Sequence, residues 1–167
     1  MNFIEHKLNA FYYCLYLMEK KLHLAFNRIN IMLLLFRIPY IKNRMKKKYG
    51  IEDPLDFYND FFLNKEYGFS FRYIFGAFFS TLLILLLTIS IFVNKLLRLN
   101  IQFRFYHLII FGVISYVIHY YLIDRKDIYL KYFEKFEKWN TEQKRRNVIF
   151  SLLFIILVMA LLIESLI

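Results

Sequence analysis

Residues 73–94 read YIFGAFFSTLLILLLTISIFVN and contain no Asp, Glu, Lys or Arg. Two further charge-free runs follow, FYHLIIFGVISYVIHYYLI at residues 105–123 and NVIFSLLFIILVMALLI at residues 147–163. The runs contain 22, 19 and 17 residues. Because a helix rises about 1.5 Å per residue, they extend about 26–33 Å, which matches the hydrocarbon core of a bilayer, about 30 Å thick. The sequence therefore predicts an all-α, polytopic membrane protein with three transmembrane helices.

The chain is expected to divide into two domains. Residues 1–69 form an N-terminal region of amphipathic and short interfacial helices on the inner side of the membrane, and residues 70–167 form the transmembrane domain. Its three spans are predicted at about 71–94, 105–124 and 147–166. A helical loop on the inner side is predicted between the second and third spans, at 125–146. An apolar stripe at helical spacing runs through this loop: Ile128, Tyr132, Phe133, Phe136 and Trp139. The stripe predicts that the second span continues as a helix beyond the membrane.

The first 38 residues contain neither Gly nor Pro. Apolar residues recur there at alternating spacings of three and four: Leu8, Phe11, Leu15, Met18, Leu22, Ala25, Ile29, Met32 and Phe36. This seam predicts one long amphipathic helix packed on a neighbour. A two-stranded homomeric coiled coil and a helix lying on the membrane surface are alternatives. Tyr12, Tyr13 and Tyr16 lie off the seam, so the helix is expected to need cover on more than one side.

The stretch at residues 29–41 is apolar apart from Asn30 and Arg37, and Pro39 is expected to end it. It is short for a span, so the prediction is an interfacial helix. A fourth span at residues 22–41 is an alternative, which the charges of Arg28 and Arg37 oppose.

A basic segment follows, with five cations in seven residues: Lys42, Arg44, Lys46, Lys47 and Lys48. Such a cluster attracts an anionic leaflet by about 1 kcal/mol per cation. It therefore predicts binding to anionic lipids such as cardiolipin. Cation clusters also meet nucleic-acid phosphates, but no folded reader domain accompanies this one, so no nucleic-acid partner is expected.

Local signals predict several helix boundaries. Asp53 followed by Pro54 indicates the start of a short helix that ends near Asn64. Ser70 is expected to cap the first span. Asn140 with Gln143 three residues later resembles a capping box that opens the third span.

The charges also predict an orientation. Of the 23 Lys and Arg residues, 12 precede the first span, three lie in the first loop and eight in the second. The positive-inside rule therefore places the N-terminus and the second loop inside and the C-terminus outside. No secretory signal peptide or Arg- and Ser-rich transit peptide is recognised at the start of the sequence.

Chemistry-bearing residues are sparse, and no catalytic residue is predicted. Single Cys14 excludes an intrachain disulfide and a multi-cysteine metal site, and no phosphate loop or nucleophile motif is present. His107 and His119 are the two histidines inside the second span. They lie twelve residues apart, about 18 Å along a helix, and cannot chelate one metal. Each is a candidate haem ligand with a partner histidine from another subunit, or a hydrogen-bonded interfacial histidine. We expect no enzyme activity, no metal and, unless a histidine binds haem, no cofactor.

The composition favours residues with AT-rich codons. Phe, Tyr, Ile, Asn and Lys supply 81 of the 167 residues, whereas Gly, Ala, Arg and Pro supply 19. In this usage the chain resembles the hydrophobic, Phe- and Tyr-rich proteins of AT-rich mitochondrial genomes such as those of ciliates. The resemblance implies a subunit of a respiratory complex or of ATP synthase, in the mitochondrial inner membrane. A low-GC bacterium is the alternative source.

The layout also resembles the membrane anchors of succinate dehydrogenase. Those anchors have an inner N-terminal segment, three spans and a haem-ligating histidine on the second, and here His107 and Gly112 are the matching residues. Ser70-Phe71-Arg72 does not reproduce the Ser…Arg quinone pattern of the anchors, so no quinone or haem site is transferred.

The leading hypothesis is a non-catalytic integral subunit of a large inner-membrane energy-transducing complex, acting in assembly and in subunit and lipid packing. Its partners are other membrane-protein subunits, and the N-terminal helix, the helix after Asp53 and the stripe at 128–139 are the expected docking surfaces. One alternative is a bacterial inner-membrane immunity or defence protein that acts as a homo-oligomer. The other is a haem-carrying membrane anchor.

Overall fold

The computed structural model describes residues 3–66 and 68–166, which form helices and connections with no strand among them. The helices in chain order are α1 (Phe3–Phe26), α2 (Ile31–Phe36), α3 (Pro39–Tyr49), α4 (Pro54–Leu63), α5 (Ser70–Leu97), α6 (Phe105–His119), the π-helix η1 (Tyr120–Asp124), the 3₁₀ turn η2 (Arg125–Asp127), α7 (Ile128–Glu137) and α8 (Thr141–Leu166). Three segments are long and apolar enough to cross a bilayer: Ser70–Leu97, Phe105–Glu137 and Thr141–Ser165. The predicted all-α membrane class is confirmed.

The chain forms two compact units. The span unit contains Met1–Leu15 and Phe75–Ile167, and the connecting unit contains Tyr16–Ile74. Both α1 and α5 therefore contribute residues to both units. The predicted domains at 1–69 and 70–167 stay a prediction, and the terminal residues 1, 2 and 167 lie outside the described part of the chain.

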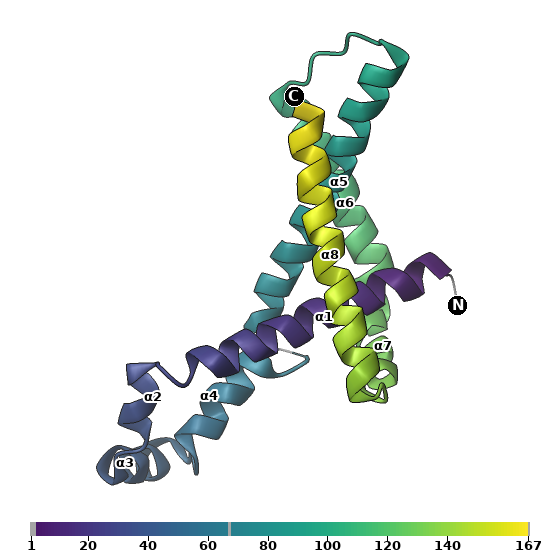
Figure 1. The fold of residues 1–167 in the computed structure, drawn as a ribbon. Helices are drawn as coiled ribbons and strands as arrows, with labels where there is room; N and C mark the ends of the chain where they lie inside the picture. Colours follow the sequence, from purple (N-terminus) through teal and green to yellow (C-terminus); the bar gives the residue numbers. More distant parts are fainter. Residues whose placement is uncertain (1–2, 67, 167) are drawn as a thin grey trace. The chain divides into compact units, whose positions relative to one another are not determined.

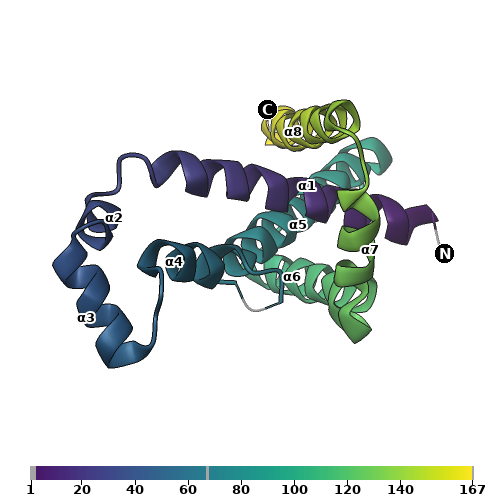
Figure 2. The same cartoon turned by 90° about the horizontal axis from the view of Figure 1, so that it is seen from below.

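In the span unit the first half of α1 lies between α8 on one side and α7 on the other (Figures 1 and 2). The Phe11 ring contacts Phe154 of α8 edge-on, with ring centroids 5.6 Å apart, and also contacts Phe78 of α5. Tyr13 packs on Phe133 of α7 at 4.9 Å. Residues 3–15 of α1 thus hold α5, α7 and α8 together through aromatic side chains, which combine a large apolar area with defined packing geometry.

The α7 stripe is covered by the chain itself. Tyr132, Phe133 and Phe136 are 5%, 0% and 0% exposed, and they pack on α1 through His6 and Tyr13. The expectation that the stripe docks other subunits is wrong for these three residues, because an amphipathic helix far away in the sequence already buries them.

The buried face of α1 also differs from the predicted seam. Within the part of α1 that belongs to the span unit, the buried residues are Asn9, Tyr12, Tyr13, Cys14 and Leu15, and of these only Leu15 lies on the seam. The tyrosines that lie off the seam are therefore core residues. By contrast, Leu22 and Ile29 of the seam are 54% and 75% exposed, and the side chain of Met32 lies outside the described ones. The aromatic rings of α5 and α7 select the tyrosine face because they offer edge-to-face partners.

The predicted helix over the first 38 residues is interrupted. α1 ends at Phe26, a turn follows, and α2 begins at Ile31. Pro39 does not end this apolar stretch but occupies the first turn of α3, where its missing N–H costs nothing. Residues 22–41 are thus shared among three helices and form no single span-length helix.

The second span does not continue straight into α7. The helix widens into η1, and Lys126 and Asp127 then adopt the left-handed conformation, with φ of 57° and 55°. Two successive left-handed residues cannot continue a right-handed helix. α7 therefore starts in a new direction (Figure 2), and this change of direction brings its apolar stripe onto α1.

In the connecting unit, α4 packs on the second half of α1. His23 stacks on Tyr58 and Phe62 with ring centroids 5.5 and 4.9 Å apart, and Asn27 donates to Asn59 Oδ1 at 2.8 Å. Gly68 fits after α4 because a Cβ there would collide with the Asn64 carbonyl oxygen.

Two of the predicted caps are confirmed and one is wrong. The Asp53 carboxylate accepts the Leu55 N–H at 2.9 Å, with Pro54 as the first residue of α4. At the start of α8, Asn140 Oδ1 accepts the Gln143 N–H and Gln143 Oε1 accepts the Asn140 N–H, which is the predicted capping box. Ser70 is instead the first residue of α5, and its hydroxyl donates to Glu19 at 3.2 Å.

Candidate functional site

His119 is the most enclosed histidine of the chain's described part, at 1% exposure. It is the last residue of α6 and lies among three rings of the span unit: Phe75 at 4.7 Å, Phe78 at 5.3 Å and Tyr12 at 5.5 Å between centroids. All three meet the imidazole edge-to-face, an arrangement that aromatic rings prefer. We call His119 with Tyr12, Phe75, Phe78 and Asp124 the histidine cluster.

Asp124 enters the cluster because of the π-helix. His119 and Asp124 are five residues apart, so in an α-helix they would point in different directions. The wider turn of η1 turns them toward the same side, with His119 Nδ1 3.0 Å from Asp124 Oδ2. The distance is that of an ion pair, but the direction is not that of a hydrogen bond, because both imidazole nitrogens lack a hydrogen-bond partner within the described residues. The π-helix therefore places a carboxylate beside an enclosed imidazole.

The surroundings favour the protonated, neutral form of the Tyr12 phenol. Burial raises the pKa of the Tyr12 phenol above its ordinary value of 10.0, and the negative charge of Asp124 raises it further. Tyr12 therefore stays protonated beside His119 at physiological pH. With the imidazole enclosed on three sides, binding of a haem iron to His119 requires Tyr12, Phe75 or Phe78 to move. In this arrangement the cluster joins α1, α5 and α6.

Asn9 completes this junction one turn away on α1. Its side chain is fully buried, and Nδ2 donates to the Glu5 and Leu122 carbonyl oxygens, each at 2.8 Å. Leu122 lies in η1, at the C-terminal end of a helix where the last carbonyls lose their internal partners. Asn9 thus caps the second span from another helix. Sequence reasoning did not identify Asn9 or Asp124, although Asn9 shares a helix face with Tyr12, Tyr13 and Tyr16.

His107 lies at the other end of α6 and has a different role. Its Nδ1 accepts the Arg104 N–H at 3.0 Å, and the imidazole stacks on Tyr106 at 4.1 Å. It caps the start of α6 and is partly exposed. The structure does not bring His107 and His119 together, because α6 separates them. Their role as haem ligands stays a prediction.

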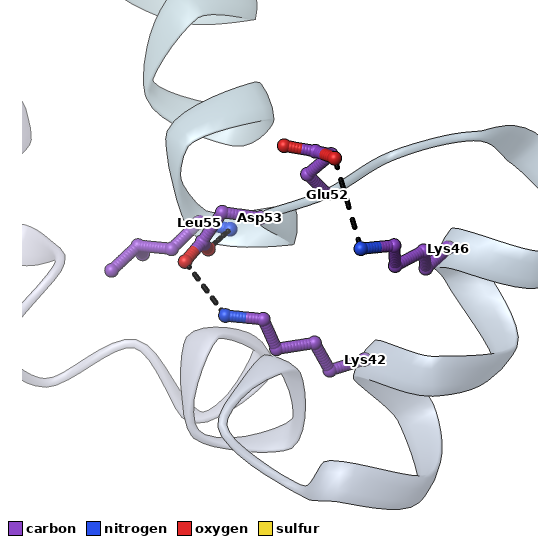
Figure 3. A network of polar contacts seen from close by, with 5 residues as sticks. All are labelled: Lys42, Lys46, Glu52, Asp53 and Leu55. Carbon is purple, nitrogen blue, oxygen red and sulfur yellow. Dashed lines mark hydrogen bonds and ion pairs between the residues drawn. The ribbon is translucent and has the colours of Figure 1, made fainter.

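The basic segment forms most of α3, which has no buried residue among those described. Two of its five cations meet acidic residues of the loop before α4, as Figure 3 shows: Lys42 Nζ lies 2.9 Å from Asp53 Oδ2, and Lys46 Nζ lies 3.7 Å from Glu52 Oε1. The hydrogen bond from Lys42, followed by that from the Leu55 N–H, holds the pKa of Asp53 below its ordinary value of 3.8. The pair with Lys42 thus ties α3 to the cap of α4.

The other cations of α3 are free to meet anions outside the chain. Arg44 and Lys47 form no ion pair with the residues that the structure describes, and Lys48 lies 5.2 Å from the centre of the Tyr49 ring. Tyr40 and Tyr49 flank the cations and are 72% and 63% exposed. Exposed tyrosines beside cations are typical of segments at the headgroup level of a membrane.

Comparison with known proteins gives no relative: no protein-family model, curated protein or solved structure matches this chain.

Proposed function

We propose that this protein is a non-catalytic integral subunit of a large inner-membrane energy-transducing complex, a respiratory complex or ATP synthase, where it acts in assembly and in subunit and lipid packing. One observation carries the proposal. Large apolar side chains are exposed on segments that do not span the membrane. In the connecting unit Phe26, Ile29 and Ile31 are 62%, 75% and 74% exposed. Large apolar side chains exposed so close together in the sequence are typical of a protein or membrane interaction site.

The spans give a second reason to expect neighbours. Little of each span is buried within the chain. In the most apolar stretch of Ser70–Leu97 the buried share is 22%, and in those of Phe105–Glu137 and Thr141–Ser165 it is 17% each. Most of each span therefore faces lipid or other transmembrane helices. Such faces supply the contacts by which a small subunit packs against larger ones.

The mitochondrial inner membrane is the proposed location, with the N-terminus inside and the C-terminus outside. The AT-rich residue usage and the cation-rich N-terminal region and second loop support it. On this topology α3 meets the inner leaflet, and Arg44, Lys47 and Lys48 attract anionic headgroups such as those of cardiolipin.

The test is to solubilise native membranes in mild detergent, separate the complexes on a blue native gel and identify what migrates with this chain. The expected result is comigration with subunits of a respiratory complex or of ATP synthase. Migration as a small homo-oligomer overturns the proposal in favour of an immunity or defence protein. Comigration with succinate dehydrogenase subunits together with a Soret band assigned to this chain replaces the non-catalytic role with that of a haem anchor.

A further inference from the structure

A cavity of about 450 Å³ opens in the span unit between α1, α5 and α8. Figure 1 shows that α1 crosses α8 in this unit. It is lined mainly by apolar side chains from three helices, among them Leu8 and Phe11 of α1, Leu82 and Leu85 of α5, and Phe150 and Phe154 of α8. The volume falls in the range of small-molecule sites, about 300–1,000 Å³. None of the roles discussed above uses this cavity.

The cavity has a polar end and an apolar end along α8. Its lining begins at Asn147 and continues through Phe150 to Phe154, a rise of about 10 Å. Lys144, Arg145 and Arg146 precede Asn147 and lie outside the charge-free run. The cavity therefore reaches from the headgroup level into the first turns of the hydrocarbon region.

The groups at the polar end are cationic. Lys7 lines the cavity and is exposed. Arg145 and Arg146 line an adjoining surface hollow that shares Phe150 with the cavity, and Glu142 is the acidic residue in that hollow. Lys7, Arg145 and Arg146 outnumber Glu142, so the mouth of the cavity favours an anion.

The interior is neutral. Burial raises the pKa of the Cys14 thiol and outweighs the hydrogen bond with Ser151, which acts to lower it, so the thiol stays protonated. The Ser151 hydroxyl donates to the Asn147 carbonyl oxygen at 2.9 Å and its hydrogen is thereby satisfied. An acyl chain that enters the cavity therefore does not remove water from a charged group. Burial of the chain is favourable because no unpaired charge is buried with it.

We propose that this cavity binds one anionic phospholipid, with an acyl chain between α1, α5 and α8 and the phosphate at Lys7 and the cations that precede Asn147. The site is separate from the basic segment of α3, and it requires only that the chain lies in a bilayer. A bound lipid would bridge α1 and α8 and so stabilise their crossing.

The test uses the full chain in phosphatidylcholine nanodiscs that contain a trace of phosphatidylglycerol with a photoreactive acyl chain. Labelled peptides are mapped by mass spectrometry. The expected labels lie around Phe11 and Phe154, and unlabelled phosphatidylglycerol removes them in a saturable way. Equal labelling of these peptides by a photoreactive phosphatidylcholine overturns the proposal that the site selects an anionic headgroup. Removal of the label by a prenyl quinone, but not by excess phosphatidylglycerol, assigns the cavity to a neutral ligand instead.

Two pairs of variants localise the site. Ala10→Phe fills the cavity from α1 and is expected to lower labelling, whereas Ala160→Phe makes the same change on α8 away from the lining and is expected to leave it unchanged. Lys7→Gln is expected to reduce the preference for phosphatidylglycerol about fivefold, the equivalent of ~1 kcal/mol per cation, while Lys131→Gln on α7 does not. Equal effects within either pair overturn the assignment. Because saturable labelling of the unaltered chain is measured independently, an Ala10→Phe variant that fails to fold leaves the test intact.

Discussion

α1 carries bulky apolar side chains along its whole length, but its two halves differ in how much of that surface the chain covers. In the span unit Tyr12 and Tyr13 are 3% and 2% exposed, because α5 and α7 supply aromatic rings to pack on. In the connecting unit Leu22 and Phe26 are 54% and 62% exposed, although His23 between them is buried on α4. The same amphipathic pattern is thus a core in one unit and an open surface in the other. The difference teaches that periodicity identifies an apolar face but not its partner.

The largest effect is expected from Phe133→Ala, which removes the α7 ring that packs on Tyr12 and Tyr13. Phe133 is fully buried, so the variant should lose about 3 kcal/mol of unfolding free energy through lost contacts and a cavity. Unfolding of the detergent-solubilised chain by a denaturing surfactant measures it.

Phe26→Ala is the matched change on the open half of α1. Because exposed substitutions usually stay within about 0.5 kcal/mol, it should leave the stability of the isolated chain unchanged and weaken comigration with partner subunits. If Phe26→Ala destabilises the isolated chain as much as Phe133→Ala, the contrast between the two halves of α1 is wrong.

The next effect concerns Asn9, whose amide joins α1 to η1. Asn9→Ala leaves the Leu122 carbonyl without this donor, and a buried unsatisfied polar group costs about 1–3 kcal/mol. Hydrogen exchange should become faster in η1 and in the first half of α1. Asn43→Ala, on exposed α3, is the control and should change neither region. Unaltered exchange in η1 would show that Asn9 does not hold the π-helix.

The sequence predicts the features that depend on neighbouring residues. Absence of charge over 22 residues is sufficient to identify the first span, and Asp53 before Pro54 and Asn140 before Gln143 each carry their own cap. These signals act within a few positions of the chain, so no tertiary contact can easily override them.

Features that depend on distant residues or on an irregular backbone are not predicted. The contact of Asn9 with Leu122 joins positions 113 residues apart, and the meeting of His119 with Asp124 needs a π-helix. Likewise, the turn at Lys126 and Asp127 reorients the α7 stripe, and the spacing of apolar residues contains no signal for it. Two non-glycine residues in the left-handed region persist only where the surrounding structure compensates for their strain.

The basic segment offers a smaller test, which compares a cation that is paired with an acidic residue of the connecting unit with a cation that forms no such pair. Lys47→Gln should lower the preference of the chain for anionic over zwitterionic lipid about fivefold, which corresponds to ~1 kcal/mol for one cation. Lys42→Gln should have less effect because Asp53 already pairs with Lys42. Native mass spectrometry with mixed phosphatidylglycerol and phosphatidylcholine measures the ratio. An equal loss in both variants would mean that the Lys42–Asp53 pair opens at the membrane.

The smallest effect is the acid dependence of the start of α4. The pKa of Asp53 is lowered in the folded chain, so its contribution is complete above the ordinary value of 3.8 and is lost as the pH falls through the folded pKa. Amide exchange at Leu55, corrected for its intrinsic pH dependence, should therefore accelerate below about pH 4. Asp53→Asn keeps an oxygen for the cap and should abolish this pH dependence with slow exchange retained, whereas Asp53→Ala should exchange fast at every pH. If amide exchange at Leu55 still accelerates in acid in the Asp53→Asn variant, another carboxylate causes the acid dependence of α4. The pair of Asp53 with Lys42 is then a consequence of the fold of the connecting unit rather than a cause of it.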